Sequence, residues 1–142
     1  MVCRALYYHD TTMYHLSSHS IMPNHVHVLL HPIDNPTTQP ETWLSDERED
    51  STSPLSRIMH SLKSYTANKA NKMLQRSGQF WQHELYDHWV RDDDELERVA
   101  EYIDYNAVKA GLVRQAHEWC FCSAHDRFVD DGSLHGLLKF PT

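Results

Sequence analysis

The run Met22–Leu30, with the sequence Met-Pro-Asn-His-Val-His-Val-Leu-Leu, constrains the fold of this chain more than any other segment. Side chains on a β-strand alternate between its two faces, so residues two positions apart point the same way. His25 and His27 therefore share one face of the expected strand, and the aliphatic residues that follow each of them occupy the other. Imidazole is the commonest metal ligand among side chains, and a strand fixes the separation of two rings. The run thus predicts a strand that presents a pair of metal ligands.

Turn signals and hydrophobic spacing predict a hairpin, a helix and an extended segment over the first two thirds of the chain. Residues 13–32 are typical of a strand pair whose second strand spans Ile21–Leu30. Helical spacing of hydrophobic residues predicts a helix over Pro54–Arg76, and Ser53 followed by proline suits its N-terminus. Gln79–Arg91 is rich in aromatic residues, which favours a strand or an extended structure.

A second helix is expected between the acidic run Asp92–Glu95 and Gly111. Acidic side chains are stabilised at the positive end of a helix dipole, and glycine commonly follows the last turn. At helical spacing, Tyr102, Asn106 and Lys109 lie together along the flank of the apolar stripe. If this flank packs against the histidine strand, an amide oxygen and two imidazoles meet, and such donors suit Mg²⁺ or Mn²⁺. The spacing alone favours a simpler interpretation, a half-buried tyrosine and a helix-surface asparagine.

The net charge of −7 argues against a general nucleic-acid binder, but the charge is unevenly distributed. The charged residues of segment 33–53 are predominantly acidic, and this segment is expected to form an exposed loop. Between Pro54 and Trp81 there is no acidic residue, so this segment can face a polyanion. The basic residues of this segment that are candidates to face such a polyanion are Lys63, Lys69, Lys72 and Arg76. Three of them share one helical face, for which a solvated helix surface is the alternative interpretation.

Length and composition predict a single domain over residues 1–142, with a loose tail at 132–142. The three cysteines make an odd number without a Cys-x-x-Cys pair, which favours free thiols in a reducing cytoplasm over a metal site. No stretch approaches the roughly 20 apolar residues that cross a bilayer, and the first residues do not form a secretory signal. We therefore expect a cytoplasmic protein without a membrane partner.

The run Met22–Leu30 resembles the metal-binding segment of the HUH single-tyrosine transposases, and most of all that of the REP-associated tyrosine transposases. Further similar segments follow in the same order: Leu62–Thr66, Ser77–Trp81, Asp87–Asp92 and Tyr102–Val113. The resemblance covers roughly residues 13–119. It implies the α+β fold of HUH endonucleases, which is ferredoxin-like or RRM-like, with an antiparallel sheet and packed helices.

The resemblance also implies the roles of the site residues. In such proteins the two strand histidines and a polar residue four positions after the nucleophilic tyrosine bind a divalent metal. Carried onto this chain, the ligands of Mg²⁺ or Mn²⁺ are His25, His27 and Asn106, and the nucleophile is Tyr102. Tyr105 competes for this role, but the residue four positions after it is Lys109, which cannot ligate a cation while it is protonated. Lys109 instead joins Lys63, Lys69, Lys72 and Arg76 as the residues expected to bind DNA.

The implied activity is that of a transposase that cleaves and rejoins single-stranded DNA through a 5′-phosphotyrosine intermediate. The implied partners are DNA hairpins such as REP-like elements or transposon ends, and the implied assembly is a monomer or a homodimer. Base stacking on Trp81 or Trp89 would add to the preference for single strands.

Two alternative functions remain open at this point. Proteins of this family carry a strand and a helix before the Met-Pro-Asn-His segment, whereas only residues 1–21 precede it here. Either an N-terminal truncation or a diverged start is therefore expected, and with it the alternative of a hairpin-binding relative that no longer cleaves. The other alternative is a zinc protein that uses the histidines for binding or hydrolysis, although the chain lacks a His-Glu-x-x-His motif.

Overall fold

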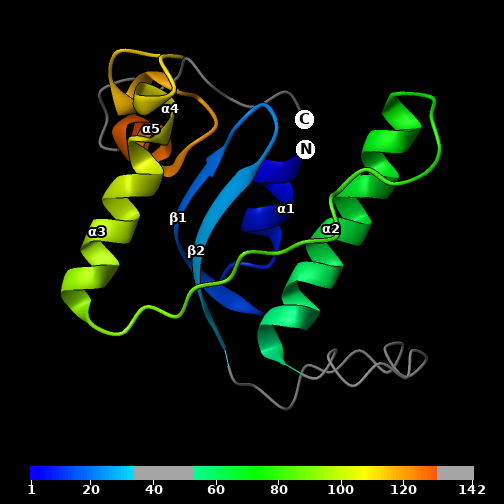
Figure 1. Ribbon diagram of the computed structural model, residues 1–142, viewed down its shortest axis with the longest axis horizontal. Coiled ribbons are helices and arrows are strands. Elements are labelled where there is room, and N and C mark those ends of the chain that lie inside the picture. Colours follow the sequence, from blue (N-terminus) through cyan, green and yellow to red (C-terminus); the bar gives the residue numbers. More distant parts are fainter. Residues whose placement is uncertain (34–52, 131–142) are drawn as a thin grey trace. The chain divides into compact units, whose positions relative to one another are not determined.

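The computed structural model describes residues 1–33 and 53–130, which divide into two compact units (Figure 1). Unit 1 comprises residues 1–15 and 31–88, and unit 2 comprises residues 16–30 and 89–142, as far as these are described. The described elements are helices and a two-stranded antiparallel sheet, so the predicted α+β class is confirmed. The expected acidic loop and the expected C-terminal tail lie outside the described residues, apart from the two residues that border the loop.

Strands β1 (Tyr14–Ile21) and β2 (Val26–Pro32) form the predicted hairpin. Its turn lies at Met22–His25, where the Met22 backbone N–H donates to the His25 carbonyl over 2.8 Å. The expectation that the second strand begins at Ile21 is therefore wrong, and His25 directly precedes β2. Proline lacks a backbone N–H and has a fixed φ, so Pro23 suits this turn better than a paired strand.

Unit 1 contains helix α1 (Val2–Tyr8), which the sequence analysis does not predict, packed against helix α2 (Pro54–Met73). The Tyr14 hydroxyl donates to the Leu6 carbonyl at the end of α1 over 2.6 Å. Helix α2 begins as predicted, because the Ser53 hydroxyl accepts a hydrogen bond from the Ser56 backbone N–H. It ends at Met73, short of the predicted end at Arg76.

The segment that follows α2 is extended and contains no described strand, so of the two predicted structures the extended one is observed. Several side chains of α2 hold its first part. Asn71 donates to the Gly78 carbonyl over 2.8 Å, and the Trp81 indole N–H donates to the Thr66 hydroxyl over 2.8 Å. Tyr86, further along, is almost fully exposed. None of the described helices combines the length and hydrophobicity required to span a bilayer.

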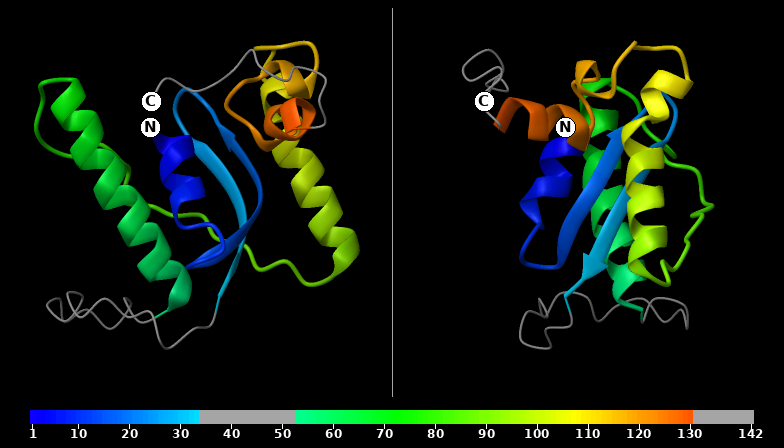
Figure 2. Two further views of the ribbon diagram at one scale, coloured as in Figure 1. Left: turned by 180° about the vertical axis from the view of Figure 1, so that it is seen from behind. Right: turned by 90° about the vertical axis from the view of Figure 1, so that its left-hand side faces the viewer.

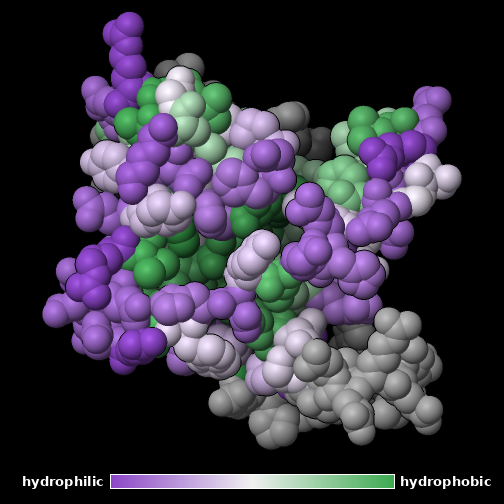
Figure 3. All heavy atoms as spheres, viewed as in Figure 1, coloured by the Kyte–Doolittle hydropathy of each residue, from purple (hydrophilic) through white to green (hydrophobic). Residues whose placement is uncertain are grey.

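Unit 2 contains helices α3 (Asp93–Asp104), α4 (Asn106–Lys109) and α5 (Ser123–Phe128) and the 3-10 helix η2 (Ala116–Glu118). Helix α3 begins as predicted: the Asp92 carboxylate accepts from the Glu95 backbone N–H over 2.8 Å. Hydrophilic side chains cover this end of α3 (Figure 3). The prediction of one continuous helix to Gly111 is wrong, because the helix is interrupted at Tyr105.

The core face of α3 and α4 agrees in part with the predicted apolar stripe. The predicted stripe consists of Leu96, Val99, Ile103, Ala107 and Ala110. Ile103 and Ala107 are buried as expected, whereas Leu96 is exposed. Helix α3 lies beside the Leu16–Leu30 part of the hairpin (Figure 2). This packing brings the helix that carries Tyr102 to the strand that carries His27.

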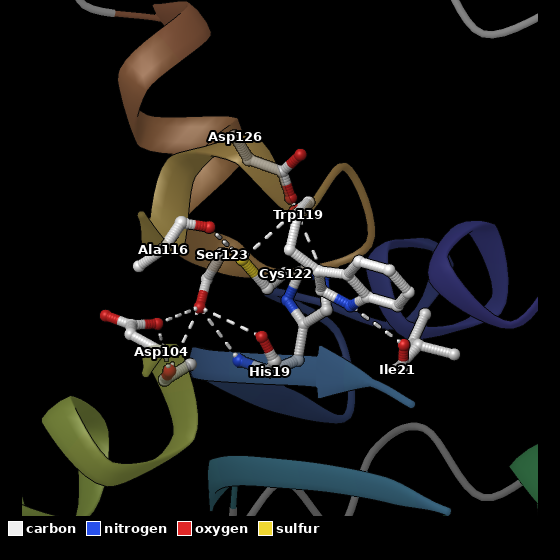
Figure 4. A network of polar contacts seen from close by, with 9 residues as sticks. His19, Ile21, Asp104, Ala116, Trp119, Cys122, Ser123 and Asp126 are labelled. Carbon is white, nitrogen blue, oxygen red and sulfur yellow. Dashed lines mark hydrogen bonds and ion pairs between the residues drawn. The ribbon is translucent and has the colours of Figure 1, made fainter. Parts of the chain in front are cut away.

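The chain returns to β1 after η2. Ser20 and Cys122 form an antiparallel bridge, and the Ile21 backbone N–H donates to the Phe121 carbonyl over 2.9 Å. The Trp119 indole N–H donates to the Ile21 carbonyl over 3.1 Å (Figure 4). A single bridge at Cys122 and its neighbouring hydrogen bonds thus connect this segment to β1, and no strand is described over residues 119–121.

Candidate active site

Three aromatic side chains of unit 2 contact one another edge to face. The ring centroids of His25 and His27 are 4.9 Å apart, with an angle of 80° between the ring planes. The Tyr102 ring of α3 lies 5.5 Å from the His27 ring, at an angle of 77°. His25 directly precedes β2 and His27 is its second residue, so the backbone of the hairpin brings the two imidazoles together. The hairpin and α3 therefore place a tyrosine against a histidine pair.

The surroundings of His27 favour its neutral form. Burial lowers the pKa of His27, and the charge of the neighbouring His25 lowers it further. His25 Nδ1 lies 2.7 Å from the Asn24 side-chain oxygen, an acceptor, so the Nδ1–H donates. This hydrogen bond leaves the Nε2 lone pair of His25 available. A neutral imidazole with a fixed tautomer is the form that ligates a metal.

The Tyr102 side chain contacts two neighbouring residues and is partly exposed to solvent. Its ring contacts His27, and the Lys109 ammonium lies 4.6 Å from the ring centroid, within the range of a cation–π interaction. The tyrosine nevertheless stays 47% exposed, so its side chain is accessible from solvent. A phenol in this environment is oriented by two neighbours and can meet a substrate as large as a DNA strand.

The interruption at Tyr105 changes how Tyr102 and Asn106 are related. The sequence analysis expects them on one flank of a single helix, but Tyr102 belongs to α3 and Asn106 is the first residue of α4. Asn106 is buried, whereas the competing Tyr105 is 48% exposed at the interruption. The position of Asn106 therefore depends on how the end of α3 is fixed, and not on helical periodicity alone.

The end of α3 is fixed by a polar network that the sequence analysis does not predict (Figure 4). The Asp104 carboxylate accepts hydrogen bonds from the hydroxyls of Ser18 and Ser123 and pairs with Arg127. The partners lie 86, 19 and 23 positions away along the chain, so no local spacing pattern reveals them.

The four basic residues of unit 1 that are expected to bind DNA differ in how free their side chains are. The Lys63 ammonium donates to the Gln82 carbonyl over 2.7 Å, and the Arg76 guanidinium donates to the Gln79 carbonyl over 2.8 Å. Lys72 and Lys69 are exposed on α2, and the Lys69 ammonium lies 6.0 Å from the Tyr65 ring centroid. Arg76 lies beyond the end of α2, so it does not share the helical face on which the sequence analysis places it.

Comparisons with known proteins agree with the motif resemblance. No protein-family model matches the chain. A putative REP-associated tyrosine transposase of Haemophilus influenzae is 38% identical over 58 residues, which make up 41% of this chain and 32% of that protein. The match thus spans about a third of the length of the curated relative. The resemblance to REP-associated tyrosine transposases is confirmed.

A solved structure has a similar fold. It contains a REP-associated tyrosine transposase bound to a REP hairpin and matches with a TM-score of 0.59. The match covers 93% of this chain and 68% of that chain, at 19% sequence identity. At this identity the likeness is one of fold.

Proposed function

We propose that this chain, which resembles the REP-associated tyrosine transposases in sequence and in fold, cleaves and rejoins single-stranded DNA with Tyr102 as the nucleophile. The observation that carries the proposal is the contact between the Tyr102 ring and the His27 ring, which in turn contacts His25 within the same unit. A nucleophile beside two candidate metal ligands is the arrangement that HUH-type strand cleavage requires. The same proposal includes the ferredoxin-like HUH fold, of which the described residues contain the hairpin and its packed helices.

The residues present fit a divalent metal. Two imidazoles and a carboxamide oxygen are donors that Mn²⁺ accepts readily and that Mg²⁺ tolerates alongside water and phosphate oxygens. His25 and His27 would hold the ion, with Asn106 as the proposed third ligand. The lowered pKa of His27 keeps its lone pair free of a proton at neutral pH. When bound, the metal withdraws charge from the phosphate oxygens of the substrate.

In the proposed reaction, the Tyr102 hydroxyl oxygen attacks the scissile phosphorus and its proton passes to solvent. The bond between phosphorus and the 3′ oxygen breaks, and that oxygen leaves as a free 3′-OH after taking up a proton. The product is a 5′-phosphotyrosine link that retains the energy of the phosphodiester, so a second 3′-OH can reseal the strand. A phenol with a pKa of about 10 is a weak nucleophile at neutral pH, which makes its orientation important. His27 and Lys109 orient it.

The proposed substrate is single-stranded DNA flanked by hairpins. The Haemophilus influenzae relative and the solved structure are both REP-associated tyrosine transposases, and the latter is bound to a REP hairpin. In this chain the basic residues proposed to contact the DNA backbone are Lys63, Lys69, Lys72, Arg76 and Lys109. Their local positive charge attracts phosphates although the whole chain is acidic. A monomer or a homodimer acting in the cytoplasm fits this role.

The test is formation of a covalent protein–DNA adduct. The protein is incubated with Mn²⁺ and a labelled DNA hairpin that carries a single-stranded flank, and the products are separated on a denaturing gel. The Tyr102→Phe variant should form no adduct and should bind the hairpin normally, because only the attacking oxygen is lost. The matched control is Tyr105→Phe, which should form the adduct. An adduct retained by Tyr102→Phe would overturn the assignment of the nucleophile.

The adduct experiment and metal analysis of the purified protein together separate the alternative functions. Hairpin binding by the unmodified protein without an adduct under any divalent metal would favour a binding protein that no longer cleaves. Tight stoichiometric zinc in the purified protein, with hydrolysis or binding that does not involve DNA, would favour a zinc protein. Weak binding of Mg²⁺ or Mn²⁺ together with the adduct would support the transposase.

A further inference from the structure

The last residue of α3 carries a buried carboxylate with partners on two other elements of unit 2. Asp104 is only 9% exposed. Its Oδ1 accepts from the Ser18 hydroxyl of β1 over 3.0 Å and from the Ser123 hydroxyl at the start of α5 over 2.8 Å. Its Oδ2 pairs with the Arg127 guanidinium of α5. One side chain therefore fastens the end of α3 to β1 and to α5 (Figure 4).

The partners of Asp104 are themselves held in place. The Ser123 hydroxyl accepts from the His19 backbone N–H over 3.0 Å, and the hydroxyls of Ser18 and Ser123 lie 2.9 Å apart. Ser18 and Ser123 are buried. A buried carboxylate with several donors has its charge stabilised, and its removal leaves those donors without an acceptor. The network thus fixes the end of α3, and few other side chains could replace the carboxylate of Asp104.

The position of Asp104 in the sequence gives this network a functional meaning. Asp104 lies two residues after Tyr102 and two residues before Asn106. Helix α3 ends at Asp104, and α4 begins at Asn106 after the interruption at Tyr105. A shift of the Asp104 side chain therefore moves the last turn of α3, which carries Tyr102, and the first residue of α4 together.

We propose that Asp104 is a positioning residue: it holds the Tyr102 ring against His27 and fixes the position of Asn106 at the start of α4. The effect on strand cleavage rests on the proposed function. The effect on the position of the Tyr102 ring does not, because it concerns a contact inside the free protein. Asp104 itself lies on the other side of the helix interruption from the metal ligand and is not proposed to touch the DNA.

The test compares variants of Asp104 with a matched control. Asp104→Ala removes the carboxylate, and Asp104→Asn keeps its shape but loses the charge that pairs with Arg127. The control is Asp126→Asn, which removes a carboxylate charge from the same network on α5; Asp126 Oδ2 lies 3.6 Å from His19 Nε2. The first readout is the nuclear Overhauser effect between the ring protons of His27 and Tyr102 in the free protein. The second is the rate of adduct formation at saturating hairpin DNA, alongside the hairpin Kd.

We expect Asp104→Ala to lose the ring-to-ring signal and to slow adduct formation at saturating DNA about 10- to 100-fold, as misplacement of a reacting group does. The hairpin Kd should stay unchanged, because binding does not depend on the phenol. Asp104→Asn should weaken the ring signal and slow the reaction less, and Asp126→Asn should leave both as they are. A general loss of stability would not separate the rate from the Kd in this way.

The proposal is overturned if Asp104→Asn keeps the full ring signal, or if Asp126→Asn loses it to the same degree as Asp104→Asn. Should circular dichroism find Asp104→Ala unfolded, the comparison of the two asparagine variants decides. If the unmodified protein forms no adduct at all, the proposed function fails, whereas the ring signal still decides whether Asp104 positions Tyr102.

Discussion

The Lys109 ammonium lies 4.6 Å from the centroid of the Tyr102 ring, although the two residues belong to different helices. The interruption at Tyr105 does not separate them, because backbone hydrogen bonds from Tyr105 to the Glu101 carbonyl and from Lys109 to the Tyr105 carbonyl, each of 3.0 Å, continue across it. The Lys109 ammonium lies over the Tyr102 ring, and the His27 imidazole contacts the same ring edge to face. These two contacts leave the phenol few orientations.

Removal of this cation should slow the reaction modestly. Lys109→Met is expected to reduce the rate of adduct formation at saturating DNA about two- to fivefold, the value of an exposed cation–π contact. Lys109→Arg should retain most of the rate, because a guanidinium also stacks on the ring. The control is Lys69→Met, which removes a cation 6.0 Å from the Tyr65 ring on α2. Equal effects of the two methionine variants on this rate would show that Lys109 acts through general charge alone.

Divalent cations should be required for the adduct and should act through the histidine pair. We expect EDTA to abolish adduct formation and added Mn²⁺ to restore it in the unmodified protein. In His27→Ala, Mn²⁺ should not restore the adduct, because one of two neighbouring imidazoles is missing. The control is His31→Ala, an exposed histidine of the same strand that should leave the Mn²⁺ response unchanged. Full restoration in His27→Ala would remove His27 from the metal site.

The stability of the protein should decrease in mildly acidic solution. Burial lowers the pKa of the fully enclosed His19 and outweighs the opposite effects of Asp126 and Asp104; Arg127 lowers this pKa further. The folded state therefore favours the neutral imidazole, whereas the unfolded chain takes up a proton near its ordinary pKa of 6.5. Because the unfolded state binds more protons, the free energy of unfolding should fall as the pH drops below this value.

Urea unfolding between neutral and acidic pH measures this effect. The His19→Gln variant should lose part of the pH dependence, since histidines such as His9 also have a lowered pKa in the folded protein. The control is His60→Gln, on the exposed side of α2, which should keep the slope of the unmodified protein. An identical slope in all three proteins would mean that His19 titrates alike in both states.

In unit 1, the hydrogen bond that connects the segment after α2 to this helix should make a measurable contribution to the free energy of unfolding. The buried Thr66 hydroxyl donates to the Leu62 carbonyl over 2.6 Å and accepts from the Trp81 indole N–H. Thr66→Val leaves this N–H without its acceptor and should lower the free energy of unfolding by about 1 kcal/mol. The control is Thr12→Val, whose exposed hydroxyl donates to His9 and whose loss should cost no more than about 0.5 kcal/mol. Denaturant unfolding with Trp fluorescence reports on both.

The elements that could be predicted from the sequence are those whose signals are local. Ser53 followed by proline marks the start of α2, and the acidic run marks the start of α3; in both cases a side chain and a backbone N–H three residues later form the cap. The hairpin was predictable because strand periodicity needs only neighbouring residues. Its turn was placed wrongly, since alternation continues through Met22–His25 although these residues do not pair as a strand.

What could not be predicted depends on residues far apart in the chain. Helix α3 ends at Asp104, whose carboxylate bonds to side chains from β1 and α5, whereas periodicity alone predicts that the helix continues. Helix α1 has no capping side chain, so nothing in its first residues indicates a helix. The candidate site was reached through motif resemblance: spacing places Tyr102 and Asn106 near each other but does not relate either to His27.

The return of the chain to β1 has a consequence for self-association. An exposed strand edge offers free backbone amides and carbonyls to any other extended chain and so promotes aggregation. At the Ser20–Ile21 end of β1, these groups are already engaged by Trp119, Phe121 and Cys122. Residues 119–122 therefore occupy this part of the strand edge. A strand of another chain could pair with the hairpin at this end only after displacing them.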